Sequence, residues 1–254
     1  MHQRRQVIPR PADSTPGGPA PWAGLPAASR RGLSVARLRP ALEAHRRALD
    51  SSQRVTFDAI PGVRAPAGVL VPLFEEGEEA RVVLTRRAAH LRTHTGEVSF
   101  PGGRLEPGES PEDGARREAA EEVGLDAGSV EVVGRLSPLS TFSSGATITP
   151  VVGLLPGRPE LRANPAEVEH VFDVALADLA ADGVFSEERW HLPGRLPLLG
   201  PPVAPRPSAA GGPSGDQPLE PGWFPMWFFD LPDDTIWGAT ARMLVELLRL
   251  ALDV

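Results

Sequence analysis

Three carboxylates share one face of a predicted helix near the middle of the chain. Glu118 and Glu122 are four residues apart and Glu121 lies between them, a spacing that puts all three on the same helical face. Like charges at this spacing destabilise an isolated helix by roughly 0.2–0.5 kcal/mol, and the helix dipole disfavours anions in the last turn. A bound cation would offset both costs. Mg²⁺ prefers oxygen ligands and leaves room for substrate phosphates, whereas the helix holds no histidine that would favour zinc.

The loop before this helix favours a metal site over the simpler alternative, a solvated acidic face. From Gly103 to Leu125 the sequence reads G-x5-E-x7-R-E-A-x-E-E-x-G-L. We predict the helix itself over Pro111–Val123, because Ser110 can cap its start and proline suits the first helical position. Gly124 supplies the stop that ends it.

This run resembles the signature of the Nudix hydrolases at all nine defined positions. The resemblance implies an α/β (mixed α+β) fold: an α/β/α sandwich with a mixed β-sheet and a loop–helix–loop metal site. It also implies Mg²⁺- or Mn²⁺-dependent hydrolysis of a nucleoside diphosphate linked to another moiety. By the same resemblance, Glu118 and Glu122 are direct metal ligands, Glu121 is a further ligand or the base, and the Gly102 carbonyl is a backbone ligand.

The other motif residues are expected to have structural roles. Glu109 and Arg117 would pair and hold the helix against its loop, which begins at Gly103. The general base is less defined, because in this superfamily it can lie on a downstream loop. Residues 164–169 form such a loop here, and Glu167 or Glu169 could reach the metal or remain a surface carboxylate.

A histidine and three arginines lie upstream of the motif. His94 is another possible base, or a loop histidine that only forms hydrogen bonds. Between residues 81 and 104 there are five arginines and one acid, a local charge of +4 in a chain of net charge −7. Arginine binds phosphate through paired hydrogen bonds. We therefore expect at least one of Arg86, Arg87 and Arg92 to bind a substrate phosphate, with Arg92 preferred; Arg86 and Arg87 could instead be strand surface residues.

The segment over residues 83–103 resembles the additional signature of the coenzyme A diphosphatase branch, L-L-T-x-R-[SA]-x3-R-x3-G-x3-F-P-G-G. Val83 replaces the first leucine and the other defined positions fit. This resemblance implies that coenzyme A or acyl-CoA is split to 3′,5′-ADP and 4′-phosphopantetheine or its acyl form. Two alternatives stay open: a broad hydrolase of ADP-ribose, NADH or dinucleoside polyphosphates, and a non-enzymatic Nudix module that binds nucleotides.

Apolar patterning around these motifs predicts a mixed α and β chain without βαβ alternation. The expected helices cover residues 34–49, 111–123 and 235–250. The expected strands cover residues 67–74, 81–84, 98–100, 130–136, 148–155, 168–174 and 223–229.

Composition limits the kinds of site and partner that the chain can have. The 254 residues include no cysteine, lysine or tyrosine, which excludes disulfides, thiolate metal sites, Schiff-base chemistry and a P-loop lysine. The acidic balance argues against nucleic acid and anionic membranes as partners, and no run is apolar for the ~20 residues that span a bilayer. We expect no secretory signal, a cytoplasmic location and a small-molecule partner, coenzyme A or a derivative; oligomeric state stays open.

Domain organisation follows from two low-complexity stretches. Residues 1–32 are rich in Pro, Gly, Ala and Arg and are expected to form a disordered or loosely docked tail. Residues 33–254 are expected to form a single Nudix domain. Within it, Pro193–Pro225 holds ten prolines and six glycines, a composition expected to form an insertion, at about 193–222, and not a helix or central strand.

Overall fold

A mixed β-sheet with helices on both faces positions the acidic helix. The computed structural model describes residues 6–52, 64–91, 93–140, 146–192 and 221–254. Within these ranges eight strands form the main sheet, whose central path is β4-β3-β2-β8-β6; β5 also pairs with β2, β7 with β8 and β9 with β3. The β2–β8 pair is parallel and the others are antiparallel. These strands are β2 (Arg64–Glu76), β3 (Glu79–Arg87), β4 (Val98–Ser99), β5 (Gly102–Arg104), β6 (Glu131–Arg135), β7 (Leu139–Ser140), β8 (Ala146–Leu154) and β9 (Val168–Ala175).

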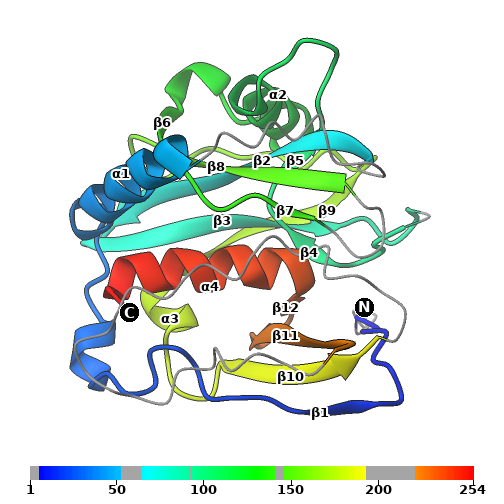
Figure 1. Cartoon of the computed structure of the whole chain (residues 1–254). Helices are drawn as coiled ribbons and strands as arrows, with labels where there is room; N and C mark the ends of the chain where they lie inside the picture. Colours follow the sequence, from blue (N-terminus) through cyan, green and yellow to red (C-terminus); the bar gives the residue numbers. More distant parts are fainter. Residues whose placement is uncertain (1–5, 53–63, 92, 141–145, 193–220) are drawn as a thin grey trace.

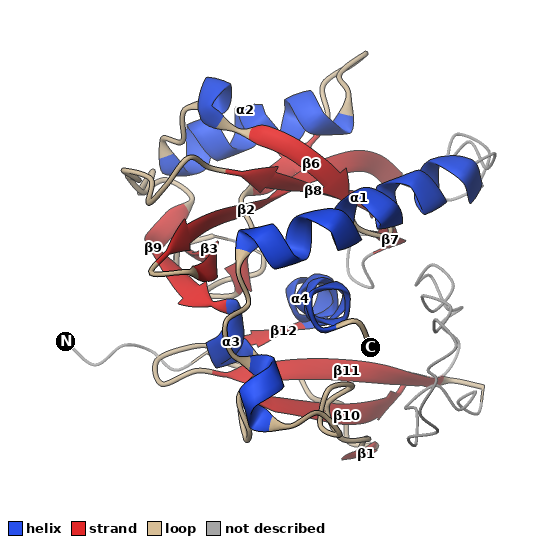
Figure 2. Ribbon diagram, turned by 90° about the vertical axis from the view of Figure 1, so that its left-hand side faces the viewer, coloured by secondary structure: helices blue, strands red, loops and turns tan. Residues whose placement is uncertain are grey.

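Helix α2 covers one face of this sheet, and α4 covers the other with α1 alongside (Figure 1). Figure 2 looks along α4 and shows it between the main sheet and a second, smaller sheet. The fold class expected from the sequence, an α/β/α sandwich with a mixed sheet, is confirmed. The helices are α1 (Val35–Ser52), α2 (Pro111–Val123), the short α3 (Leu176–Leu179) and α4 (Gly238–Leu252), with 3-10 turns at Ala27–Arg30 and Ala127–Ser129.

The central strand β2 is apolar on both sides because helices cover both sides. Successive strand residues point to opposite faces. Leu70 and Phe74 pack with the α2 side of the core, whereas Val71 and Leu73 pack with the α4 side, and all four are buried. Such near-continuous apolar runs are typical of strands covered on both faces. The rigid sheet thus gives α2 a fixed base.

The second sheet corrects three expectations from the sequence. Its strands, in the order β1-β10-β11-β12, are β1 (Ser14–Pro16), β10 (Phe185–His191), β11 (Trp223–Asp230) and β12 (Thr235–Trp237). The helix expected over 235–250 begins only at Gly238, because the β-branched and aromatic residues of β12 pair with β11. β10 escaped prediction because its centre is polar. The third correction concerns the end of the low-complexity stretch: Trp223–Pro225 belong to β11, which confirms the strand expected over residues 223–229. Residues 193–220 of the expected insertion lie outside the described residues.

The N-terminal segment from residue 6 onward is attached to this second sheet. β1 pairs with β10, and Trp22 is only 1% exposed, stacked on Phe229 with ring centroids 6.3 Å apart. Arg30 is buried and donates to the carbonyl of Ala180 at 2.9 Å. These contacts differ from the disordered or loosely docked tail expected from composition. No helix of the described residues has the length and apolarity needed to cross a membrane.

Replacing Trp22 with alanine tests whether this segment is part of the core. We expect Trp22→Ala to lower the free energy of unfolding by about 3–5 kcal/mol, since it removes a large buried aromatic side chain. Val7→Ala is the matched control, because Val7 lies in the same segment and is 88% exposed. Urea unfolding of both variants provides the measurement. A loss below about 1 kcal/mol for Trp22→Ala would support a loosely docked segment instead.

Candidate active site

The start and end of α2 are fixed by local hydrogen bonds and by a close approach to β2. The Ser110 side chain accepts from the backbone N–H of Asp113 at 3.2 Å, and Gly124 ends the helix in the left-handed conformation at φ 67°. A side chain at Gly68 would place its Cβ 2.5 Å from the Pro111 carbonyl oxygen, so only glycine lets the helix lie this close to the sheet. The bounds of α2 match the sequence prediction.

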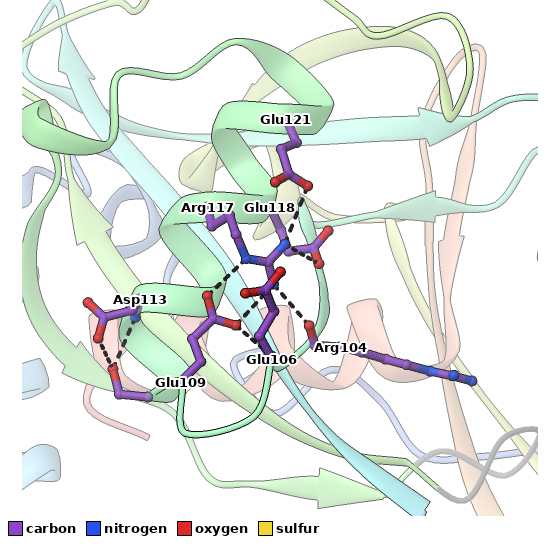
Figure 3. A network of polar contacts seen from close by, with 8 residues as sticks. Arg104, Glu106, Glu109, Asp113, Arg117, Glu118 and Glu121 are labelled. Atoms are coloured by element: carbon purple, nitrogen blue, oxygen red, sulfur yellow. Dashed lines mark hydrogen bonds and ion pairs between the residues drawn. The ribbon is translucent and has the colours of Figure 1, made fainter.

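The guanidinium of Arg117 joins the helix to the loop before it (Figure 3). Its Nε and Nη2 donate to the two carboxylate oxygens of Glu109 at 2.9 and 3.0 Å, and Nη2 also donates to the Arg104 carbonyl at 3.0 Å. Its Nη1 donates to Glu118 at 2.9 Å and to Glu121 at 3.3 Å. Arg117 lowers the pKa of Glu109. The structure therefore brings together the Glu109–Arg117 pair that the motif implied.

Glycine at position 103 makes room for the carboxylate of Glu118. A Cβ built on Gly103 would lie 2.6 Å from Glu118 Oε2 and closer still to the carboxyl carbon. The Gly-Gly turn of β5 and the middle of α2 are thus in direct contact. Burial raises the pKa of Glu118, while Arg117 opposes that shift.

We call the carboxylates of Glu118, Glu121, Glu122 and Glu167 the acidic cluster. The carboxylate of Glu122 lies at its centre. It is only 3% exposed and accepts a hydrogen bond from the Gly102 N–H at 3.2 Å. Burial, helped by the nearby carboxylates of Glu167 and Glu118, raises the pKa of Glu122 to about 7, against the lowering effects of the Gly102 N–H and Arg87. The site therefore gathers negative charge that the protein only partly neutralises.

This donor set fits a hard divalent cation. Glu118, Glu122 and Glu167 supply anionic oxygens, which Mg²⁺ and Mn²⁺ prefer, and a cation would relieve the burial of like charges. Among the described residues, no three acidic or histidine side chains are already arranged as a metal site. The Gly102 carbonyl remains a predicted ligand.

The other possible bases lie in different surroundings. Glu121 has a side chain 59% exposed and faces Arg117. Glu169 lies 3.3 Å from Arg86, and His94 pairs with Glu97 at 2.8 Å, which raises the pKa of the histidine. Among these carboxylates, those of Glu121 and Glu167 raise the pKa of Glu118 through charge repulsion.

The three predicted phosphate-binding arginines have different positions. Arg87 reaches the site, with Nη1 3.9 Å from Glu122 Oε1. Arg86 is buried and donates to Asp234 at 2.8 Å, so its guanidinium is engaged in the interior and does not reach the acidic cluster. Adjacent strand residues point to opposite faces, which separates the two. Arg92 lies outside the described residues.

Asp234 and Asn164 are site-supporting residues that the sequence reasoning missed. Asp234 holds Arg86 from 148 positions away, a distance no local pattern signals. Asn164 bonds the end of α2 to the loop that carries Glu167. An asparagine before a proline is a turn signal, which could have marked this position.

The chain is similar to known proteins of one family. The NUDIX domain model matches residues 64–196. Two proteins named "Uncharacterized Nudix hydrolase NudL" are similar: that of Yersinia enterocolitica is 44% identical over 111 residues, covering 43% of this chain and 56% of the relative. That of Yersinia pestis is 45% identical over 126 residues, covering 49% and 60%. The matches thus span less than two thirds of the relatives' length. A MutT/nudix family protein from Enterococcus faecalis has a TM-score of 0.47 at 16% identity, covering 87% of this chain and 75% of that one.

A single methyl group at residue 103 tests the contact between the glycine turn and α2. We expect Gly103→Ala to displace the Glu118 carboxylate and to lower kcat by about 100-fold, because small misplacements of reacting groups have effects of that size. The melting temperature should change little, since the displaced atoms are the end of a flexible side chain. Gly157→Ala, with open space around it, is the control. An alanine variant with normal kcat would contradict the role of this contact.

Proposed function

The chain belongs to the NUDIX domain family, and on that premise we propose that it is a metal-dependent diphosphatase that splits coenzyme A or its acyl thioesters. Water would add across the diphosphate to release 3′,5′-ADP and 4′-phosphopantetheine or its acyl form. The observation that carries the proposal is Arg87. It belongs to the segment that resembles the coenzyme A diphosphatase signature, and it lies beside the buried Glu122 of the acidic cluster.

The acidic cluster supports the metal dependence. Nudix hydrolases generally use divalent metal cations. We assign Glu118 and Glu122 as the residues that hold Mg²⁺ or Mn²⁺, with Glu121 and the Gly102 carbonyl as further ligands. A bound cation would neutralise the diphosphate, stabilise the leaving oxygen and make water easier to deprotonate near neutral pH.

The protein's own groups would do the rest of the chemistry. Glu167 is exposed to solvent yet close to Glu118 and Glu122, so it is placed to accept the proton of the attacking water. Arg87 would bind the diphosphate, because its side chain is partly exposed and its Nη1 lies 3.9 Å from Glu122 Oε1. We assign the 3′-phosphate to Arg92. Glu109, Arg117 and Gly103 would keep the cluster in place.

Metal binding can be measured apart from turnover. We expect Glu122→Gln to weaken Mn²⁺ binding at least tenfold, because it removes an anionic ligand from the buried centre of the cluster. Electron paramagnetic resonance titration of free Mn²⁺ gives the readout, and activity should fall by several orders of magnitude. Glu112→Gln is the control on the same helix, since Glu112 pairs with Arg135 instead. Unchanged Mn²⁺ affinity in Glu122→Gln would refute the metal assignment.

The substrate is tested by the ratio of kcat/KM for coenzyme A and dephospho-coenzyme A. Charge-assisted hydrogen bonds contribute roughly 1.5–3 kcal/mol, so the wild type should prefer coenzyme A by roughly ten- to a hundredfold. Arg92→Ala should lose most of this preference. Arg87→Ala should lower kcat/KM for both substrates by the same factor, because both contain the diphosphate.

A panel with ADP-ribose, NADH and a dinucleoside polyphosphate separates the alternatives. Equal activity on all of them, with no preference for coenzyme A, would favour a broad hydrolase. No metal-dependent phosphate release from any of them would favour a nucleotide-binding module.

A further inference from the structure

The loop between β8 and β9 is bonded directly to the end of α2. A helix leaves its last carbonyls without intrahelical partners. The Arg162 N–H donates to the Val123 carbonyl at 2.8 Å, and the Asn164 N–H donates to the Glu122 carbonyl, also at 2.8 Å. The Asn164 side-chain Nδ2 donates to the Glu121 carbonyl at 3.4 Å. The main chain of two cluster glutamates is therefore bonded to one asparagine.

The same asparagine organises the loop that follows it. Its Oδ1 accepts from the Ala166 N–H at 3.1 Å, and its carbonyl accepts from the N–H groups of Glu167 at 3.0 Å and Val168 at 2.8 Å. The Glu167 carbonyl accepts from the Ala88 N–H at 2.8 Å, at the end of β3. The backbone of Glu167 is thus held on both sides, by Asn164 and by β3.

A fixed backbone matters here because the side chain of Glu167 lies near two carboxylates of like charge. Its carboxylate is exposed and faces Glu118 and Glu122, which repel it. We propose that Asn164 is a positioning residue, which holds Glu167 against the acidic end of α2 for proton abstraction. This inference rests on the proposed role of Glu167 as the base.

The end of α2 itself does not depend on the Asn164 side chain. The N–H groups of Gly124 and Leu125 donate to the carbonyls of Ala120 at 3.0 Å and Ala119 at 3.3 Å. The backbone bonds from residues 162 and 164 also survive truncation of the asparagine. Replacing Asn164 with alanine therefore removes only its two side-chain bonds, the one from Nδ2 to the Glu121 carbonyl of the helix and the one from the Ala166 N–H to Oδ1 within the loop.

A double-mutant cycle tests this role in the full chain, with coenzyme A at saturating Mg²⁺. We expect Asn164→Ala to lower kcat by about tenfold, the effect of one or two hydrogen bonds, and to change KM less than about twofold. Glu167→Gln should lower kcat by about 100-fold or more. In the Glu167→Gln background, Asn164→Ala should change kcat less than about twofold, because the base it positions is gone.

Two further variants complete the test. Asn164→Asp keeps the acceptor for the Ala166 N–H but loses the Nδ2 donor to the Glu121 carbonyl, so its kcat should lie between those of Asn164→Ala and the wild type. Asp126→Ala is the matched control, because the Asp126 Oδ1 accepts from Gly128 N–H in a similar turn that does not contact the cluster. It should leave kcat unchanged. Melting temperatures of all variants report on folding.

The outcomes separate the two proposals. Equal effects of Asn164→Ala in both backgrounds, an unchanged kcat, or failure of Asn164→Asp to exceed the alanine variant would overturn the role of Asn164 alone. Near-normal kcat in Glu167→Gln would overturn both the base and the positioning role. Absence of any turnover by the wild type would instead refute the proposed function.

Discussion

The ion pairs of the Arg117 guanidinium join the two halves of the acidic site. One side of this group binds Glu109 and the Arg104 carbonyl in the loop, and the other binds Glu118 on the helix. An arginine is suited to this because its planar donors reach several acceptors at once. Together with the pairing of β5 to β2, these bonds hold Gly103 against Glu118.

The main sheet connects the acidic site to the rest of the chain. β3 ends in two adjacent arginines whose side chains diverge: Arg87 meets Glu122, and Arg86 meets Asp234. Asp234 directly precedes β12, so a buried ion pair joins the second sheet to the strand that lines the site. Breaking a buried ion pair is strongly destabilising, because one charge is left in the interior without its partner. The pair therefore holds the two sheets in one relative position. This residue pair connects the second sheet, and the N-terminal segment paired to it, to the site.

How far the sequence predicts this structure depends on how local each signal is. The bounds of α2 were predicted because Ser110, proline and Gly124 act on their own neighbours. The Glu109–Arg117 pair lies within one motif and was predicted by resemblance to known proteins. β10 was missed because its centre is polar and its partner strands are distant in sequence, and β12 because a strand of three residues shows no period of its own. The different positions of Arg86 and Arg87 were not predictable. Successive side chains of a strand point to opposite faces of the sheet, but only the fold shows which of the two arginines faces Glu122.

Burial of Glu122 gives the free protein a cost that a cation removes. The pKa of Glu122 rises from its ordinary 4.5 to about 7, so the folded protein holds this proton more tightly than the unfolded chain does. Linkage then requires that the group lower stability as pH rises from about 4.5 to about 7, with the full cost above that range. A cation that binds the ionised carboxylate competes with the proton and offsets this cost. If Glu122 holds the cation as proposed, its burial would therefore favour the metal-bound state over the free one at neutral pH, because only the bound cation offsets the cost of the ionised carboxylate.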